Sequence, residues 1–120
     1  MKKEFRVRKN EDFSKIISKR ISLASSSFII YKDHNDIGHG RVGISVSKKL
    51  GQDVIRNKIK RQLRMMIVEC FDFNESYDYV VIVRKNYLSH QYIENKNELE
   101  SLYKKIMKRR INTHDLRQQN

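Results

Sequence analysis

Residues 41–71 constrain the fold of this chain more than any other segment, because two periodicities follow one another there. The first seven residues, RVGISVS (41–47), alternate apolar with polar or small side chains, as in a strand that buries one face. Residues 53–71 then place apolar side chains at helical spacing. These form one stripe: Ile55, Ile59, Leu63, Met66, Ile67 and Cys70. A strand followed by a long amphipathic helix indicates a fold of sheet and helices together.

The same helix carries a dense basic face beside its apolar stripe. Five side chains form this face: Arg56, Asn57, Lys60, Arg61 and Arg64, with Lys58 roughly opposite. Residues 41–64 hold 8 basic and 1 acidic residues, a net +7 within a chain whose formal charge is +12. Like charges at i,i+4 spacing repel by a few tenths of a kcal/mol per pair, about 0.2–0.5. Phosphates would neutralise this face, so we expect a polyanionic partner, nucleic acid first.

The remaining charge is divided unevenly along the chain. Residues 1–20 and 104–120 each carry a net +5, which we interpret as ordinary supporting or frayed charge at the two ends. Residues 65–103 carry a net −4 and are expected to face away from the polyanion.

Periodicity predicts the other elements as well. They are a helix over 10–19 capped by Asn10 or Asp12, a strand over 27–33, a buried strand over 78–84 and a helix over 92–110. A further strand is expected in 3–8 or near 21–23. Together these predict an α+β sandwich in the order αβββαβα, with a mixed sheet of about four strands packed with three helices.

The length of 120 residues predicts a single domain over 1–120. Its ordered core is expected over about 5–110, followed by a basic C-terminal tail over about 111–120. The one cysteine, Cys70, excludes an internal disulfide framework and fits a reducing compartment. No apolar run is long enough for a membrane span or a secretory signal, so a cytoplasmic protein without a membrane partner is expected.

No catalytic or metal site is evident among the titratable residues. The four histidines, His34, His39, His90 and His114, are scattered and lack the spacing of zinc ligands. A self-sufficient nuclease would need clustered carboxylates or a site centred on histidine, and neither pattern is present. A helix-turn-helix DNA reader is disfavoured by the two strands that flank the basic helix.

Several motifs, in order and spacing, resemble the protein subunit of bacterial ribonuclease P. The most specific array is Ser47, Lys48, Lys49, Gly51, Arg56, Asn57, Lys60, Arg61 and Arg64. The flanking motifs are RKNEDF (8–13), SFIIY (27–31) and DYVVIVR (78–84), so the resemblance covers about residues 5–107. It implies a left-handed βαβ crossover, and a ribonucleoprotein that removes the 5′ leader of precursor tRNA with an RNA catalyst. Magnesium would be bound mainly by that RNA and the substrate.

The resemblance also implies two binding surfaces. The surface expected to contact the catalytic RNA consists of Lys48, Lys49, Arg56, Asn57, Lys58, Lys60, Arg61 and Arg64. The groove expected to receive the single-stranded 5′ leader consists of Phe13, Ile17, Ile29, Tyr31, Ser45, Ser47 and Lys48. Aromatic side chains in such a groove stack bases without sequence preference.

Three questions stay open at this point. Ser25–Ser27 and Asp53 depart from the family pattern, so the resemblance assigns them no role. A general RNA-binding or ribosome-associated domain, such as a double-stranded RNA reader, is the alternative function, although such readers carry their basic patch at the start of the last helix. The third open question is whether the protein self-associates weakly in the absence of RNA.

Overall fold

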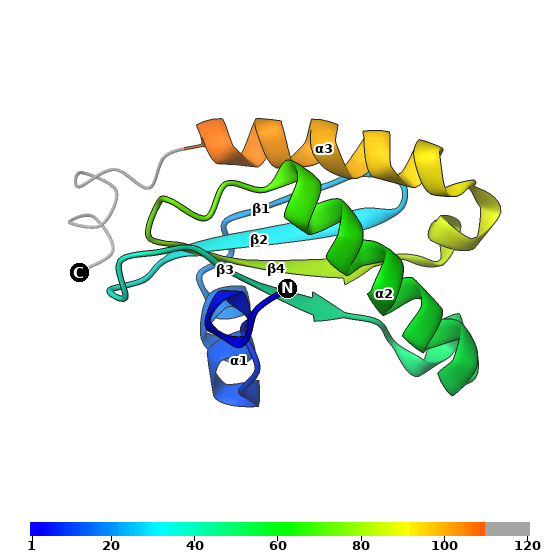
Figure 1. Ribbon diagram of the computed structural model, residues 1–120, viewed down its shortest axis with the longest axis horizontal. Coiled ribbons are helices and arrows are strands. Elements are labelled where there is room, and N and C mark those ends of the chain that lie inside the picture. The colour runs from blue at the N-terminus through cyan, green and yellow to red at the C-terminus, as the bar shows by residue number, and fades with distance from the viewer. Residues whose placement is uncertain (110–120) are drawn as a thin grey trace.

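The computed structural model describes residues 1–109, and Figure 1 shows their arrangement. Its helices are α1 (Asn10–Ser18), α2 (Asp53–Cys70) and α3 (Tyr92–Lys108), and its strands are β1 (Ser22–Ala24), β2 (Phe28–His34), β3 (Arg41–Ser45) and β4 (Tyr77–Val83). Short 3₁₀ helices are η1 (Lys3–Phe5), η2 (Lys48–Leu50) and η3 (Lys85–Ser89). The predicted α+β class and the order αβββαβα are therefore confirmed.

The four strands form one mixed sheet in the order β1-β2-β4-β3. Strands β3 and β4 are parallel and are joined through α2, whereas the other neighbours are antiparallel. The left-handedness of this βαβ crossover stays a prediction. The strand expected near 21–23 is β1, whereas the segment 3–8 forms η1 and one parallel bridge, Arg6 to Val42, at the edge of β3.

Helices cover both faces of the sheet (Figure 1). Helices α2 and α3 share one face, where Phe28, Leu63 and Val81 are fully buried and the ring of Phe71 stacks on Tyr103 at 3.9 Å between centroids. Helix α1 covers part of the other face, where Val7, Ile16 and Val80 form a smaller cluster. Alternation along each strand divides the side chains between these two cores.

The structure corrects three local predictions. Strand β3 ends at Ser45 rather than at residue 47, because the Ser47 hydroxyl accepts a hydrogen bond from the Lys49 N–H at 3.0 Å and caps η2. Ile55 is 43% exposed at the start of α2 instead of belonging to the buried stripe. No side chain caps α1, since its first residue follows Lys9 and Asp12 is engaged elsewhere.

The serine run that departs from the family pattern has a structural role. Ser25 and Ser26 donate their hydroxyls, and Ser27 its backbone N–H at 2.8 Å, to the Glu98 carboxylate of α3. Burial of Glu98 disfavours its ionised form, but these hydrogen bonds outweigh burial and lower the pKa of the carboxyl. The turn between β1 and β2 is thereby fastened to α3.

A buried lysine fastens the other end of α3. Lys32 of β2 is 1% exposed, and its Nζ donates to the carbonyls of Ile106, Met107 and Arg109 at 3.4, 3.2 and 3.0 Å. These are carbonyls that a helix leaves unpaired in its last turn. The predicted end of this helix at 110 and the tail over 111–120 lie outside the described residues. Within residues 1–109, no helix has the length and apolar character that crossing a bilayer requires.

Candidate nucleic-acid interface

The basic face of α2 is present as the helical spacing predicts. Ile59, Leu63, Met66 and Ile67 are buried against the sheet, which fixes the rotation of the helix. Lys60 and Arg64 are then half-buried along one side of it, whereas Asn57, Lys58 and Arg61 point to solvent. Within residues 1–109, none of the four cations at positions 58, 60, 61 and 64 makes an ion pair. This positive charge is therefore free to meet an external anion.

Arg56 differs from the other cations of this face. It forms an ion pair with Asp53 one turn earlier on α2, and its side chain is only 19% exposed. Asp53, one of the residues that departs from the family pattern, thus holds the arginine against its own helix. An RNA phosphate would have to compete with this carboxylate.

Lys48 and Lys49 lie at the corner between β3 and α2. Both are exposed on η2, while Leu50 beside them is buried and anchors the turn. Gly51 follows with φ of +142°, a backbone conformation that L side chains rarely adopt. The glycine therefore allows the chain to turn from the lysine pair into the basic helix.

The opposite face of the sheet is organised in rows that run across β2, β4 and β3. The register places Ile29, Ile82 and Ser45 in one row, Tyr31, Val80 and Gly43 in the next, and Asp33, Asp78 and Arg41 in the third. The first row is only partly buried, and its Ile82 packs against the cluster of Val7, Ile16 and Val80. Next to it, Phe13, Ile17 and Tyr31 are partly buried around Ile16 and Val80.

The middle row shows how closely α1 approaches the sheet. A Cβ atom added at Gly43 would lie 2.6 Å from Cζ of Phe13. Only a glycine in β3 lets the Phe13 ring reach the strand, and the ring then borders the open first row. The element that approaches this polar or small face of β3 in the structure is therefore α1.

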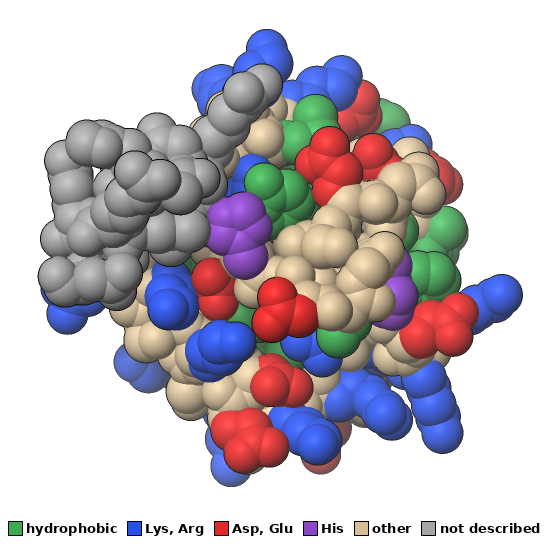
Figure 2. All heavy atoms as spheres, turned by 90° about the vertical axis from the view of Figure 1, so that its left-hand side faces the viewer, with side chains coloured by type: hydrophobic (Ala, Val, Ile, Leu, Met, Phe, Trp, Pro, Cys, Tyr) green, Lys and Arg blue, Asp and Glu red, His purple; other side chains and the backbone are tan. Residues whose placement is uncertain are grey.

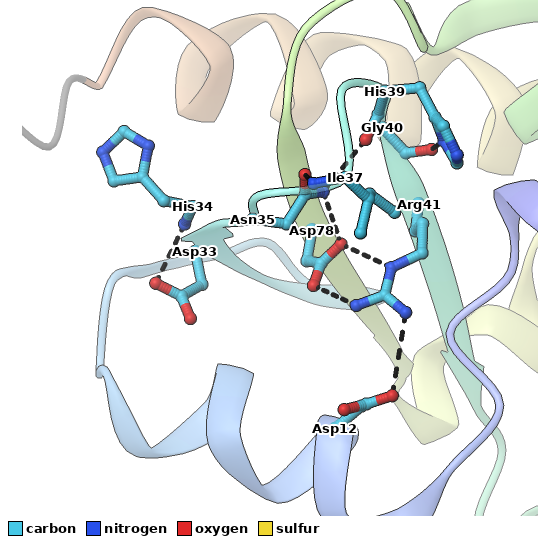
Figure 3. Close-up of polar contacts among 9 residues, drawn as sticks. All are labelled: Asp12, Asp33, His34, Asn35, Ile37, His39, Gly40, Arg41 and Asp78. Carbon is cyan, nitrogen blue, oxygen red and sulfur yellow. Dashed lines mark hydrogen bonds and ion pairs between the residues drawn. The ribbon is translucent and has the colours of Figure 1, made fainter.

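The third row contains a partly buried charge network around Asp78 and Arg41, which contacts α1 (Figure 3). Arg41 donates from Nε and Nη2 to the two carboxylate oxygens of Asp78 at 2.9 and 2.7 Å, and Asn35 donates to the same carboxylate at 2.8 Å. The Arg41 guanidinium also reaches Asp12 of α1 at 3.7 Å. Burial raises the pKa of the neighbouring Asp33, against the His34 N–H hydrogen bond and the charges of Lys19 and Lys15.

The structure brings most of the predicted leader residues together. Phe13, Ile17, Ile29, Tyr31 and Ser45 share one face of the sheet. Ser47 does not join them, because its hydroxyl caps η2, and Lys48 lies on η2 beyond the end of β3. The face itself is an open row of side chains.

Comparisons with known proteins agree with these features. The family model described as Ribonuclease P matches residues 1–107. The "Ribonuclease P protein component" of Mesoplasma florum is 44% identical over 110 residues, covering 90% of this chain and all of that protein. Its counterpart from Bacillus mycoides is 40% identical and covers 92% of this chain and 98% of the relative.

Solved structures give the same answer. The RNase P protein of Staphylococcus aureus superposes with a TM-score of 0.76 at 40% identity, over 83% of this chain and 93% of that one. The chain belongs to the bacterial ribonuclease P protein family. It is accordingly a protein component of ribonuclease P, the ribonucleoprotein endoribonuclease of tRNA 5′ processing. The Thermotoga maritima RNase P protein, at 28% identity, has the same fold with a TM-score of 0.73 over 83% of this chain and 96% of that one.

Two parts of this ribonuclease P protein's surface escaped the sequence analysis. Ile82 completes the open row, but a continuous apolar run such as 78–84 does not reveal which of its faces is covered. Arg6 and Arg8 join Lys60 and Arg64 around a cleft of about 260 Å³ between the N-terminal segment and α2. The basic composition of residues 1–20 and, for Arg8, its place in the motif RKNEDF were the available signals for them.

The described residues offer no cluster of metal ligands. Across residues 1–109, no group of three or more His, Cys, Asp or Glu side chains could hold a metal ion. We therefore assign no step to a metal ion held by this part of the chain alone.

Proposed function

We propose that this chain serves ribonuclease P by holding two RNA segments at once, the catalytic RNA on α2 and the 5′ leader of precursor tRNA on the open sheet face. The observation that carries the proposal is the partly buried row of Ile29, Ile82 and Ser45, left uncovered beside the aromatic rings of Phe13 and Tyr31. An open apolar and aromatic face next to a basic helix fits a single strand that passes a folded RNA.

The catalytic RNA would meet the face of α2 and the corner before it. Arg61 and Arg64 can each direct two N–H groups at one phosphate, which suits a folded backbone. Asn57 can donate and accept at a ribose or a base edge. Lys48 and Lys49 add two further charges where the free N–H groups of the start of α2 also point.

The leader would lie along the first row of the sheet. Tyr31 and Phe13 offer ring faces to unpaired bases, and each stacked base contributes about 1–3 kcal/mol. Ser45 offers a hydroxyl to a phosphate or a ribose, and Lys48 a charge at the end of β3. The rings stack on any base, and Ser45 and Lys48 contact the sugar-phosphate backbone of the leader. We therefore expect this surface to bind many leader sequences.

We assign cleavage of the phosphodiester to the catalytic RNA and to magnesium ions held mainly by that RNA and the substrate. The side chains of this chain bind, orient and screen charge between two polyanions. We expect the protein to act in the bacterial cytoplasm, without a membrane partner. Weak self-association in the absence of RNA is part of the same proposal, to be measured by sedimentation.

Reconstitution tests the proposal directly. The protein, a bacterial ribonuclease P RNA and a precursor tRNA are mixed at low magnesium, and cleavage at the mature 5′ end is followed with and without the protein. We expect the protein to raise the cleavage rate and to cut nothing by itself. A general RNA-binding domain would bind the RNAs and leave the cleavage rate unchanged.

A paired variant tests the leader surface. Tyr31→Ala removes the ring, whereas Tyr31→Phe keeps it and serves as the control. We expect Tyr31→Ala to weaken binding of precursor tRNA by about 5- to 150-fold, the equivalent of about 1–3 kcal/mol, with little change for tRNA lacking a leader. Equal losses for both substrates would contradict the leader assignment.

A further inference from the structure

The N-terminal segment is built into the fold. Phe5 of η1 packs against the rings of His39 and Phe73, with centroid distances of 5.2 and 5.0 Å. Arg6 bridges to Val42 at the edge of β3, and the Val7 N–H donates to the Val42 carbonyl at 3.1 Å. The edge of β3 therefore holds the backbone at Arg6 and Val7, so this part of the chain is not frayed, and the interpretation of the net +5 of residues 1–20 as supporting charge stays a prediction.

This pinned segment forms one wall of a basic cleft of about 290 Å³. The cations that line the cleft from this segment are Lys3, Arg6, Arg8 and Lys9. None of the four makes an ion pair within residues 1–109. Of the two acids in the cleft, Asp12 faces Arg41, which leaves Glu4 as the acid that opposes four cations. Figure 2 shows this end of the molecule, with basic side chains gathered over its lower half among acidic ones.

Arg6 connects this cleft with the basic face of α2. Arg6 and Arg8 line both this cleft and the second cleft, which also contains Lys60 and Arg64. The Nε atom of Arg6 is buried and has no hydrogen-bond partner among the described residues. The two clefts therefore form one continuous basic surface through the side chains of Arg6 and Arg8.

We propose that the cleft lined by Lys3, Arg6, Arg8 and Lys9 is a second phosphate-binding surface, across which an RNA backbone continues from α2 toward the loop between β2 and β3. A concave surface lined by arginines and lysines without ion-pair partners favours phosphate diesters. An arginine can donate two hydrogen bonds to two phosphate oxygens, and a lysine attracts the phosphate as a point charge. The phosphates belong either to the catalytic RNA or to precursor tRNA, which present the same chemistry. The inference rests on the proposed function, because it extends the RNA surface of α2.

The test compares two variants of equal charge loss. The first combines Lys3→Ala, Arg8→Ala and Lys9→Ala, all exposed positions that line the cleft. The matched control combines Lys15→Ala, Lys19→Ala and Lys105→Ala, which are exposed and lie outside both basic clefts. Binding to ribonuclease P RNA is measured over a range of salt concentrations, and binding of precursor tRNA and leaderless tRNA to the assembled holoenzyme is measured in parallel. Each lost phosphate contact lowers the salt slope by about 0.7–0.9.

We expect the cleft variant to bind at least about tenfold more weakly than the control, with a salt slope lower by about 2. A loss with ribonuclease P RNA assigns the phosphates to the catalytic RNA, and a loss confined to tRNA binding assigns them to the substrate. Equal affinities and slopes for the two variants would overturn the inference. Arg61→Ala is measured alongside: if it weakens RNA binding while the cleft variant does not, only the inference fails, and if neither does, the proposed function fails too.

Discussion

Some charged residues in this ribonuclease P protein stabilise the fold, and others are available to bind a partner. The two groups differ in how far their side chains are buried. Asp78 is 4% exposed and accepts three hydrogen bonds, from Arg41 and Asn35. Lys32 is equally hidden, and burial lowers the pKa of its ammonium group. The cations of α2, in contrast, have solvent access and, except for Arg56, no internal partner within residues 1–109. A stability readout and an RNA-binding readout should therefore respond to different residues.

Asp78→Asn tests the buried network. The substitution removes the charge that compensates Arg41, and we expect the free energy of unfolding to fall by about 2–4 kcal/mol in urea denaturation. The control is Asp12→Asn, which removes a longer contact of a more exposed carboxylate and should cost less than about 1 kcal/mol. Equal losses for the two variants would show that Asp78 does not hold the network together.

Glu98 makes stability depend on pH in a definite direction. Its pKa is lower in the folded protein, so the carboxylate stabilises the fold above the ordinary glutamate value of about 4.3, and this contribution is lost as pH falls through the folded pKa. We expect Glu98→Gln to lower the free energy of unfolding at pH 7 by about 1–2 kcal/mol, since charged hydrogen bonds from the serine turn are lost. Unfolding curves at pH 7 and pH 3.5 measure the free energy of unfolding of both proteins. The difference in this free energy between variant and parent should shrink at the lower pH. A constant difference would exclude this role of the charge.

Helix α2 combines a core stripe and a binding face in one element. Burial of Ile59, Leu63 and Met66 fixes the rotation of α2 about its own axis. The cations at positions 60, 61 and 64 therefore point outward or toward the β3 edge. The one acid of its first turn, Asp53, interacts favourably with the start of the helix and at the same time neutralises Arg56. Asp53 thus stabilises the first turn of the helix and at the same time reduces the positive charge that Arg56 offers to an anion.

Asp53→Ala should separate these two effects. We expect tighter binding to ribonuclease P RNA, by about 2- to 10-fold at low salt, because Arg56 is released to meet a phosphate. The melting temperature should fall slightly, in keeping with about 0.3–1 kcal/mol for an acid in the first turn of a helix. Filter binding and thermal unfolding measure the two quantities. Asp53→Asn is the control, since it keeps the side-chain size while removing the charge, and it should share the gain in affinity.

At the scale of the whole molecule, the sheet order separates two kinds of surface. Strand β3 lies at one edge, where the N-terminal segment and the basic side of α2 meet, and β1 lies at the other edge beneath α3. The cation Lys104 of α3 is paired with Glu100 at 3.1 Å, and Lys96 is paired with Glu69 of α2. Two cations on the α3 side are thereby neutralised, whereas Lys58, Lys60, Arg61 and Arg64 of α2 make no ion pair within residues 1–109.

A charge-matched pair of variants tests this asymmetry. Lys104→Ala with Lys105→Ala and Lys58→Ala with Arg61→Ala each remove two positive charges. We expect the α3 variant to keep its affinity for ribonuclease P RNA within about twofold, whereas the salt slope of the α2 variant should fall by about 1.4–1.8. Binding isotherms between about 50 and about 300 mM salt measure the affinity and the salt slope of each variant. Parallel losses would mean that net charge rather than its placement governs binding.

The sequence by itself determined the elements and the basic face. Apolar spacing along 53–71 and alternation along 41–45 are local patterns, and the backbone geometry of helix and strand converts them directly into faces. The other predicted strand ends differ from the structure by one residue, whereas the end of β3 at Ser45 lies two residues earlier than predicted. That end depended on a side-chain cap by Ser47, which periodicity does not contain.

Only the tertiary structure decided which faces meet. The open row of Ile29, Ile82 and Ser45 exists because β4, late in the chain, lies between β2 and β3. Likewise, Arg6 and Arg8 became part of a basic cleft when the N-terminal segment paired with the edge of β3. Such contacts join residues far apart in sequence, so their side chains share no period along the chain, and only the packed sheet brings them together.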